Sequence, residues 1–246
     1  MFKGSVNFVA KIKGNGMTFP LFDFNPNEVG VDKIEIEGPN GEEIRSTVHL
    51  ASVPTQDDGR TLAARVNTTA LNRVAFFHGM AIEKARCTGD QFSPLQQQPG
   101  IHSIAIGTTL FMTGSAKAVV GIPAAHLKTE LEQLSPPGER NFGLFRSARQ
   151  SESPVEEFMH LYNILLMLFN DRQAAVDAFA VGQDPAVPQS QHPMKAPGVM
   201  ESVYTRLRNE LAHKRAGVNL DDTKAEMANR LGGLIELMKR AIEIHP

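Results

Sequence analysis

The chain has one cysteine in 246 residues, which excludes an internal disulfide framework and a zinc site built on several thiolates. We expect this residue, Cys87, to be a buried and unreactive thiol. The net charge of −2 is too small for a protein that coats nucleic acid through charge alone, so any such contact would have to be a local site.

Long apolar runs are missing as well. The longest, residues 164–169, is far shorter than the roughly 20 residues that a membrane span needs, so we expect no membrane association. The start of the chain alternates apolar and polar residues and lacks the apolar run of a signal peptide. The expected location is therefore the cytoplasm.

Motifs for metal, nucleotide-phosphate or serine-nucleophile chemistry are also absent. The eight histidines lack metal-ligand spacing and form no His-Glu-x-x-His pair, so we expect neither a metal nor a cofactor. Residues 114–117 resemble part of a phosphate-binding loop but lack its first glycine and its Gly-Lys-Ser/Thr ending. No Gly-x-Ser-x-Gly nucleophile elbow occurs.

The hydrophobic pattern predicts two domains, residues 1–138 and 139–246. In the first, alternating stretches and turn signals predict strands over residues 5–12, 31–37, 43–53, 101–106 and 110–120. Between residues 61 and 80 the apolar spacing lengthens to three or four, which predicts one helix that Gly79 ends. This mixed domain carries no motif that assigns a role, and it could bind a protein partner, an RNA or a ligand.

The second domain is predicted to be a helical bundle. Ser153, Pro154 and Glu156 form a helix start, with serine as N-cap, proline at the first position and glutamate closing a capping box. Thr223 and Glu226 are expected to cap the last helix in the same way. Helices are predicted over residues 154–169, 173–181, 199–214 and 223–242, with a proline-rich loop over 182–198. The fold class is therefore α+β.

Two adjacent glycines, Gly232 and Gly233, lie inside the last predicted helix. Each costs about 1 kcal/mol of helix stability relative to alanine. Close packing against another helix, of this chain or of another subunit, would justify them, and a plain weak point is equally compatible with the sequence.

The third predicted helix of this domain ends in Arg208, Asn209 and His213. Arginine grips a phosphate bidentately and keeps its charge, whereas histidine can move a proton near neutral pH. Arg208 and His213 should lie about 140° apart around a straight helix, whereas Asn209 and His213 share a face. The amide could therefore fix the imidazole tautomer. Further positive charge that could attract a phosphate comes from Arg206, Lys214, Arg215, Arg146 and Arg149.

This combination suits phosphodiester transfer within RNA. Histidine would take a proton from the 2′-hydroxyl or give one to the leaving 5′-oxygen, arginine would stabilise the phosphoryl charge, and asparagine would orient. One histidine cannot easily be acid and base in the same step, so we expect a homodimer that pairs two copies. The same residue types also cap carbonyls and pair with acids at ordinary helix ends, so the spacing alone leaves both interpretations open.

Arg208-Asn209 followed by His213, late in a third helix and before a capped final helix, resembles the signature of the HEPN superfamily (higher eukaryotes and prokaryotes nucleotide-binding domain). Residues 158–165 and 208–220 are similar to its Apea-like and MauJ-like members, the latter of which accompany methylamine-utilisation genes, and the resemblance covers about residues 140–246. It implies a metal-independent ribonuclease with a composite dimer site, in which Arg208, Asn209 and His213 match the signature. Many members are instead non-catalytic nucleotide- or protein-binding modules, so an accessory protein of methylamine utilisation is the alternative.

Overall fold

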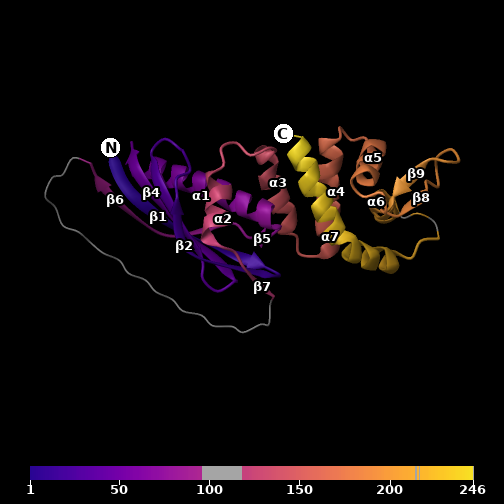
Figure 1. The fold of residues 1–246 in the computed structure, drawn as a ribbon, viewed down its shortest axis with the longest axis horizontal. Coiled ribbons are helices and arrows are strands. Elements are labelled where there is room, and N and C mark those ends of the chain that lie inside the picture. The colour runs from indigo at the N-terminus through magenta and orange to yellow at the C-terminus, as the bar shows by residue number, and fades with distance from the viewer. Residues whose placement is uncertain (96–117, 214, 216, 246) are drawn as a thin grey trace. The chain divides into compact units, whose positions relative to one another are not determined.

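A computed structural model describes residues 1–95, 118–213, 215 and 217–245 (Figure 1). The chain divides into two compact units, one of residues 1–74 and 80–134 and the other of residues 75–79 and 135–246. The first unit is rich in strands and the second is mostly helical, as the sequence predicts. The domain boundary at residue 138 stays a prediction. In the described part of the chain, no helix is long and apolar enough to cross a membrane.

A twisted sheet forms the first unit. Its strands are β1 (Phe2–Lys13), β2 (Gly16–Phe24), β3 (Val31–Gly38), β4 (Glu43–Val53), β5 (Ala81–Ile82), β6 (Arg86–Pro94) and β7 (Val119–Gly121). They run in the order β5-β1-β4-β3-β2-β7, with β6 also paired to β1. Neighbouring strands are antiparallel except β2 and β7, which are parallel.

The sheet follows the alternation that the sequence shows, because every second residue is buried over residues 6–12 of β1, 34–38 of β3 and 44–50 of β4. The helix α1 (Gln56–His78) belongs to this unit as far as Val74, and a buried hydrogen bond of 2.7 Å from Ser46 Oγ to Asn67 Oδ1 ties it to β4. The shorter α2 (Ala124–Glu132) lies beside β2.

The predicted hairpin of β3 and β4 and the predicted helix α1 are confirmed, and Gly79 follows α1 with a φ of +63°. The strands β2, β5 and β6 and the helix α2 were not predicted. The predicted strand over residues 101–106 and most of that over 110–120 lie outside the described residues, as does the segment 114–117. Cys87 is exposed, so the expectation of a buried thiol is wrong. It lies on β6, whose residues are at least partly open to solvent on both faces.

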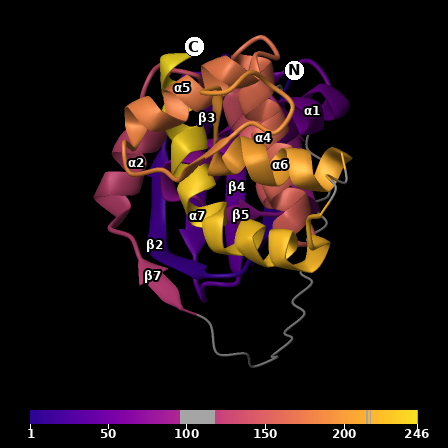
Figure 2. The ribbon, with the colours of Figure 1, turned by 90° about the vertical axis from the view of Figure 1, so that its right-hand side faces the viewer.

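The second unit is built on helices. They are α3 (Glu139–Arg149), α4 (Pro154–Leu168), α5 (Gln173–Gln183), α6 (Val203–His213) and α7 (Leu220–Ile244), and a small hairpin of β8 (Gln189–Gln191) and β9 (Met200–Ser202) precedes α6. The long helices α4 and α7 pack along each other, and α6 lies against both (Figure 2). The last turn of α1 also belongs here, where the rings of Phe76 and Phe142 stack at 3.9 Å.

The predicted N-cap of α4 is confirmed, because the hydroxyl of Ser153 accepts a hydrogen bond of 3.2 Å from the backbone N–H of Glu156. The carboxylate of Glu156 accepts from the backbone N–H of Glu152 at 3.2 Å, where the predicted capping box places that of Ser153. The predicted cap of α7 is wrong. Asn219 is the N-cap, and Thr223 instead donates from its hydroxyl to Glu210 of α6 at 2.9 Å. The helix α6 begins four residues later than predicted, because residues 200–202 pair with β8.

The two glycines of α7 differ in their surroundings. A Cβ on Gly233 would lie 2.5 Å from Tyr204 Oη of α6, whereas a Cβ on Gly232 would meet nothing described within 4 Å. Close packing therefore explains Gly233 alone. We expect Gly232→Ala to raise the free energy of unfolding by about 1 kcal/mol, because alanine restricts the unfolded chain and favours the helix. In Gly233→Ala the same gain should be cancelled or exceeded by the cost of moving Tyr204, so the free energy of unfolding should not rise.

Chemical denaturation of the two variants measures this difference. Adding Tyr204→Phe, which removes the colliding oxygen, should bring Gly233→Ala closer to Gly232→Ala. Equal stabilisation by both alanines in the parent chain would show that the contact between α6 and α7 does not require a glycine.

Candidate functional site

Helix α6 places the three signature residues at different depths. Leu207 is fully buried and packs in the core of the unit, which orients the helix. Asn209 is also buried, Arg208 is half-buried, and His213 is exposed at the last residue of the helix. The exposed imidazole can therefore meet a substrate, while the amide cannot.

Arg208 links the other two side chains. Its Nη1 donates to Asn209 Oδ1 at 3.1 Å and lies 3.3 Å from His213 Nε2. The expectation that Arg208 and His213 stay apart is wrong, because the long arginine side chain reaches around the helix to the imidazole. Since guanidinium only donates, Nε2 accepts in this contact and the proton of a neutral ring lies on Nδ1. Arginine, rather than asparagine, thus selects the tautomer.

A buried carboxylate holds this group in place. Glu201 of β9 is 1 % exposed, and its carboxylate receives two hydrogen bonds from Arg215, at 2.6 and 3.0 Å. Its Oε2 also lies 3.4 Å from Asn209 Nδ2 as an acceptor. Gln173 donates to Asn209 Oδ1 at 3.0 Å. Glu201 and Gln173 therefore fix the amide against which Arg208 rests.

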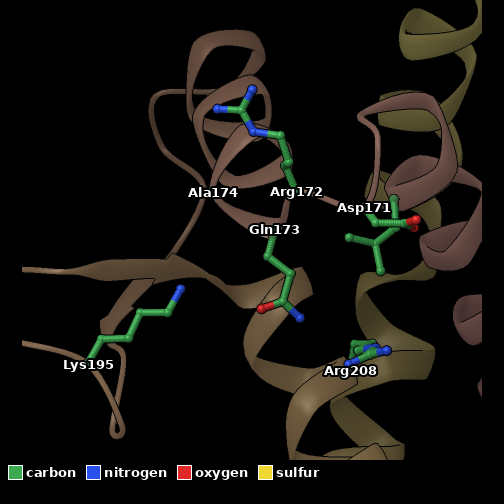
Figure 3. A pocket seen from close by; sticks show the side chains of 7 residues that line it. Asp171, Arg172, Gln173, Ala174, Lys195 and Arg208 are labelled. Carbon is green, nitrogen blue, oxygen red and sulfur yellow. The ribbon is translucent and has the colours of Figure 1, made fainter.

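A hollow of about 560 Å³ opens beside Arg208 (Figure 3). It is lined by Leu166, Asp171, Arg172, Gln173, Ala174, Lys195 and Arg208. The sequence did not reveal Arg172, Gln173 and Lys195 as site residues, because nothing in their local sequence connects them to the signature. Among the described residues, no group of three or more histidines, cysteines or carboxylates is placed to hold a metal.

Of the five further cations that the sequence predicts near this group, Arg206 and Arg215 are engaged in ion pairs. Arg206 contacts Glu210 at 2.9 Å and Glu226 of α7 at 2.7 Å. Burial alone would lower the pKa of Arg206, but hydrogen bonds to both carboxylates raise it above its usual value. Arg215 is bound to Glu201 as described above. Lys214 lies outside the described residues.

Arg146 and Arg149 do not join this group, so the expectation that they do is wrong. Both belong to α3, and Figure 1 shows α3 and α6 on opposite sides of α4. Arg146 is 5 % exposed, and burial lowers its pKa to about 10. Arg149 pairs with Glu157 and donates to the carbonyl of Gly79 at 3.0 Å. The contacts of Arg149 therefore tie α3 to α4 and to the end of α1, away from Arg208.

Residues 142–245, from the first turn of α3 to the end of α7, match the model of the family described as "Methylamine utilization protein MauJ". The C-terminal region is MauJ-like. The match covers the whole arrangement of Arg208, Asn209, His213 and Glu201, together with the hollow beside them. No curated protein and no solved structure gives a significant match to the chain.

Proposed function

We propose that the MauJ-like region is a HEPN-type domain that cleaves RNA without a metal ion, through attack of a 2′-hydroxyl on the adjacent phosphodiester. The observation that supports this proposal is the contact between Arg208 Nη1 and the exposed His213 Nε2, at the edge of a hollow lined with positive charge. A proton carrier and a permanent cation for the phosphoryl group thus lie within one hydrogen bond of each other.

The reaction begins when a phosphate reaches Arg208. The guanidinium turns one N–H from His213 to a phosphoryl oxygen, which leaves Nε2 of the imidazole free as a base. His213 then takes the proton of the 2′-hydroxyl while the 2′-oxygen bonds to phosphorus and the bond to the 5′-oxygen breaks. The 5′-oxygen receives a proton, and the products carry a 2′,3′-cyclic phosphate and a 5′-hydroxyl.

The proton for the 5′-oxygen requires a second acid, because His213 holds the proton that it has just taken. In the proposed homodimer, the second copy supplies its own His213 in protonated form. The solution mass of the full chain tests this step. A mass of two chains is the expected result, and a monomer that cleaves RNA at full rate would exclude the shared site.

A non-catalytic nucleotide- or protein-binding module, such as an accessory protein of methylamine utilisation, is the second candidate. The observation that favours it is that Arg208 already satisfies His213 Nε2 and Asn209 Oδ1 within the same chain. In this alternative the group stabilises the end of α6, and the first unit recognises a protein partner or ligand.

Incubation of the full chain with labelled RNA and excess EDTA distinguishes the two candidates, with the 2′-deoxy oligonucleotide of the same sequence as the matched substrate. The nuclease should cleave the RNA and leave the deoxy strand intact, since the attacking hydroxyl is missing there. Cleavage of both strands, or cleavage that EDTA stops, would contradict the mechanism. Binding with no cleavage of either strand would favour the module.

A further inference from the structure

The hollow beside Arg208 gathers positive charge from three segments of the MauJ-like region. Arg172 precedes α5, Lys195 lies in the loop between β8 and β9, and Arg208 belongs to α6. Asp171 is the one carboxylate among the described residues that line it. Arg172 and Lys195 are exposed, so their charges are open to a ligand. This excess of positive over negative charge favours the binding of an anion.

The start of α5 adds to this preference. Arg172 is the N-cap residue of α5, and among the described residues no side chain forms a capping hydrogen bond there. The next two residues, Gln173 and Ala174, line the hollow. The first N–H groups of a helix have no partner within the helix and attract negative charge, so they commonly bind phosphate.

Arg208 provides the observation that points to a ligand. Its Nε is buried and has no hydrogen-bond partner within the described part of the chain. Nη1 of the same guanidinium is occupied by Asn209 and His213. In Figure 3 the amide of Gln173 lies between the ammonium group of Lys195 and the guanidinium of Arg208. The charge of this guanidinium, with one donor left without an acceptor, favours a negative charge in the neighbouring hollow.

We propose that this hollow binds an RNA phosphate, the one next to the cleaved phosphate in the same strand, with Arg172 and Lys195 as substrate-binding residues. The inference rests on the proposed nuclease function, since it takes His213 as the position of the cleaved bond. Two phosphates held on either side of Arg208 would fix the register of the strand on the catalytic histidine.

RNA binding by the non-cleaving His213→Ala protein tests the site, measured with a labelled single-stranded RNA over a range of salt concentrations. Each lost phosphate contact should reduce the slope of log affinity against log salt by about 0.7 and weaken binding about fivefold at about 0.1 M salt. Because Arg172 and Lys195 bind the same phosphate, we expect the full effect for the double variant Arg172→Ala/Lys195→Ala and part of it for each single variant. Arg140→Ala, which removes an exposed arginine of α3, is the matched control and should show neither effect.

Asp171→Asn should act in the opposite direction. The substitution keeps the size of the side chain and removes the negative charge among the lining residues, so RNA should bind more tightly at the same salt concentration. Weaker binding by this variant would mean that Asp171 holds the hollow open rather than opposing the anion.

Inorganic phosphate is the second probe, measured by its effect on thermal unfolding. One outcome is that phosphate raises the unfolding temperature only when Arg172 and Lys195 are present, while neither substitution changes the RNA affinity. The hollow then binds a free anion and the RNA proposal is overturned. If both substitutions weaken RNA binding but the parent chain cleaves no RNA, the phosphate subsite is supported and the nuclease function is overturned. If the parent chain cleaves RNA and neither substitution changes binding or cleavage, the nuclease function is supported and the phosphate subsite is overturned.

Discussion

Replacing His213 by alanine is expected to lower the rate of RNA cleavage by about 10²–10⁴-fold, the range that a general acid–base residue contributes. The free energy of unfolding should change by no more than about 0.5 kcal/mol, because the side chain is exposed at the end of α6. The loss would therefore be chemical and not structural. Initial rates on a labelled RNA in EDTA, beside a denaturation curve of the same variant, measure both quantities.

His160 is the matched control. It is another exposed histidine of the MauJ-like region, and its Nδ1 lies 2.9 Å from the hydroxyl of Ser151, away from the signature residues. His160→Ala should leave the cleavage rate unchanged. Equal rates for His213→Ala and the parent chain would remove His213 from the mechanism.

Glu201→Ala is expected to lower the free energy of unfolding by about 3–5 kcal/mol, since breaking a buried ion pair leaves an uncompensated charge. The side chain of Glu201 is 1 % exposed and that of Arg215 is 15 % exposed, so the abandoned guanidinium would have little access to water. The substitution also removes an acceptor of Asn209, and the support of Arg208 should weaken with it. Urea denaturation of the variant gives the magnitude.

Glu226→Ala provides the comparison, because Glu226 also pairs with an arginine, Arg206, but is 35 % exposed. Exposed pairs contribute about 0–1 kcal/mol, so this variant should lose far less stability than Glu201→Ala. Similar losses for the two variants would contradict the distinction between a buried and a solvent-exposed pair. Glu201→Gln should lie between them, since the amide keeps one acceptor but loses the charge.

Local signals in the sequence predict a large part of the fold. The turn at Gly38 with the alternation on either side of it predicts the β3–β4 hairpin, and the Ser153 cap predicts the start of α4. These succeed because the deciding interactions lie within a few residues of each other. The strands β2 and β6 escaped prediction because their exposure does not follow a simple alternation. The start of α7 was misplaced because Thr223 is bound by Glu210, a residue of another helix.

The candidate site, too, can be predicted from the sequence only in part. The order Arg208, Asn209, His213 can be read from the sequence, whereas the contacts that these side chains make depend on residues far away in the chain. Glu201 and Gln173 reach Asn209 only because the β8–β9 hairpin and the start of α5 fold against α6. The count of arginines and lysines also overestimated the positive charge around this group, since it cannot show which arginines are neutralised by carboxylates elsewhere in the chain. Side-chain length mattered too, because an arginine can contact a residue that a helical wheel places on another face.

The most direct test of the proposed mechanism is the identification of RNA ends after incubation with the full chain in EDTA, beside the His213→Ala variant. The mechanism predicts fragments with 2′,3′-cyclic phosphate and 5′-hydroxyl ends from the parent chain and intact RNA from the variant. Fragments with other ends, equal fragments from both proteins, or intact RNA from both would contradict a metal-independent nuclease centred on Arg208 and His213.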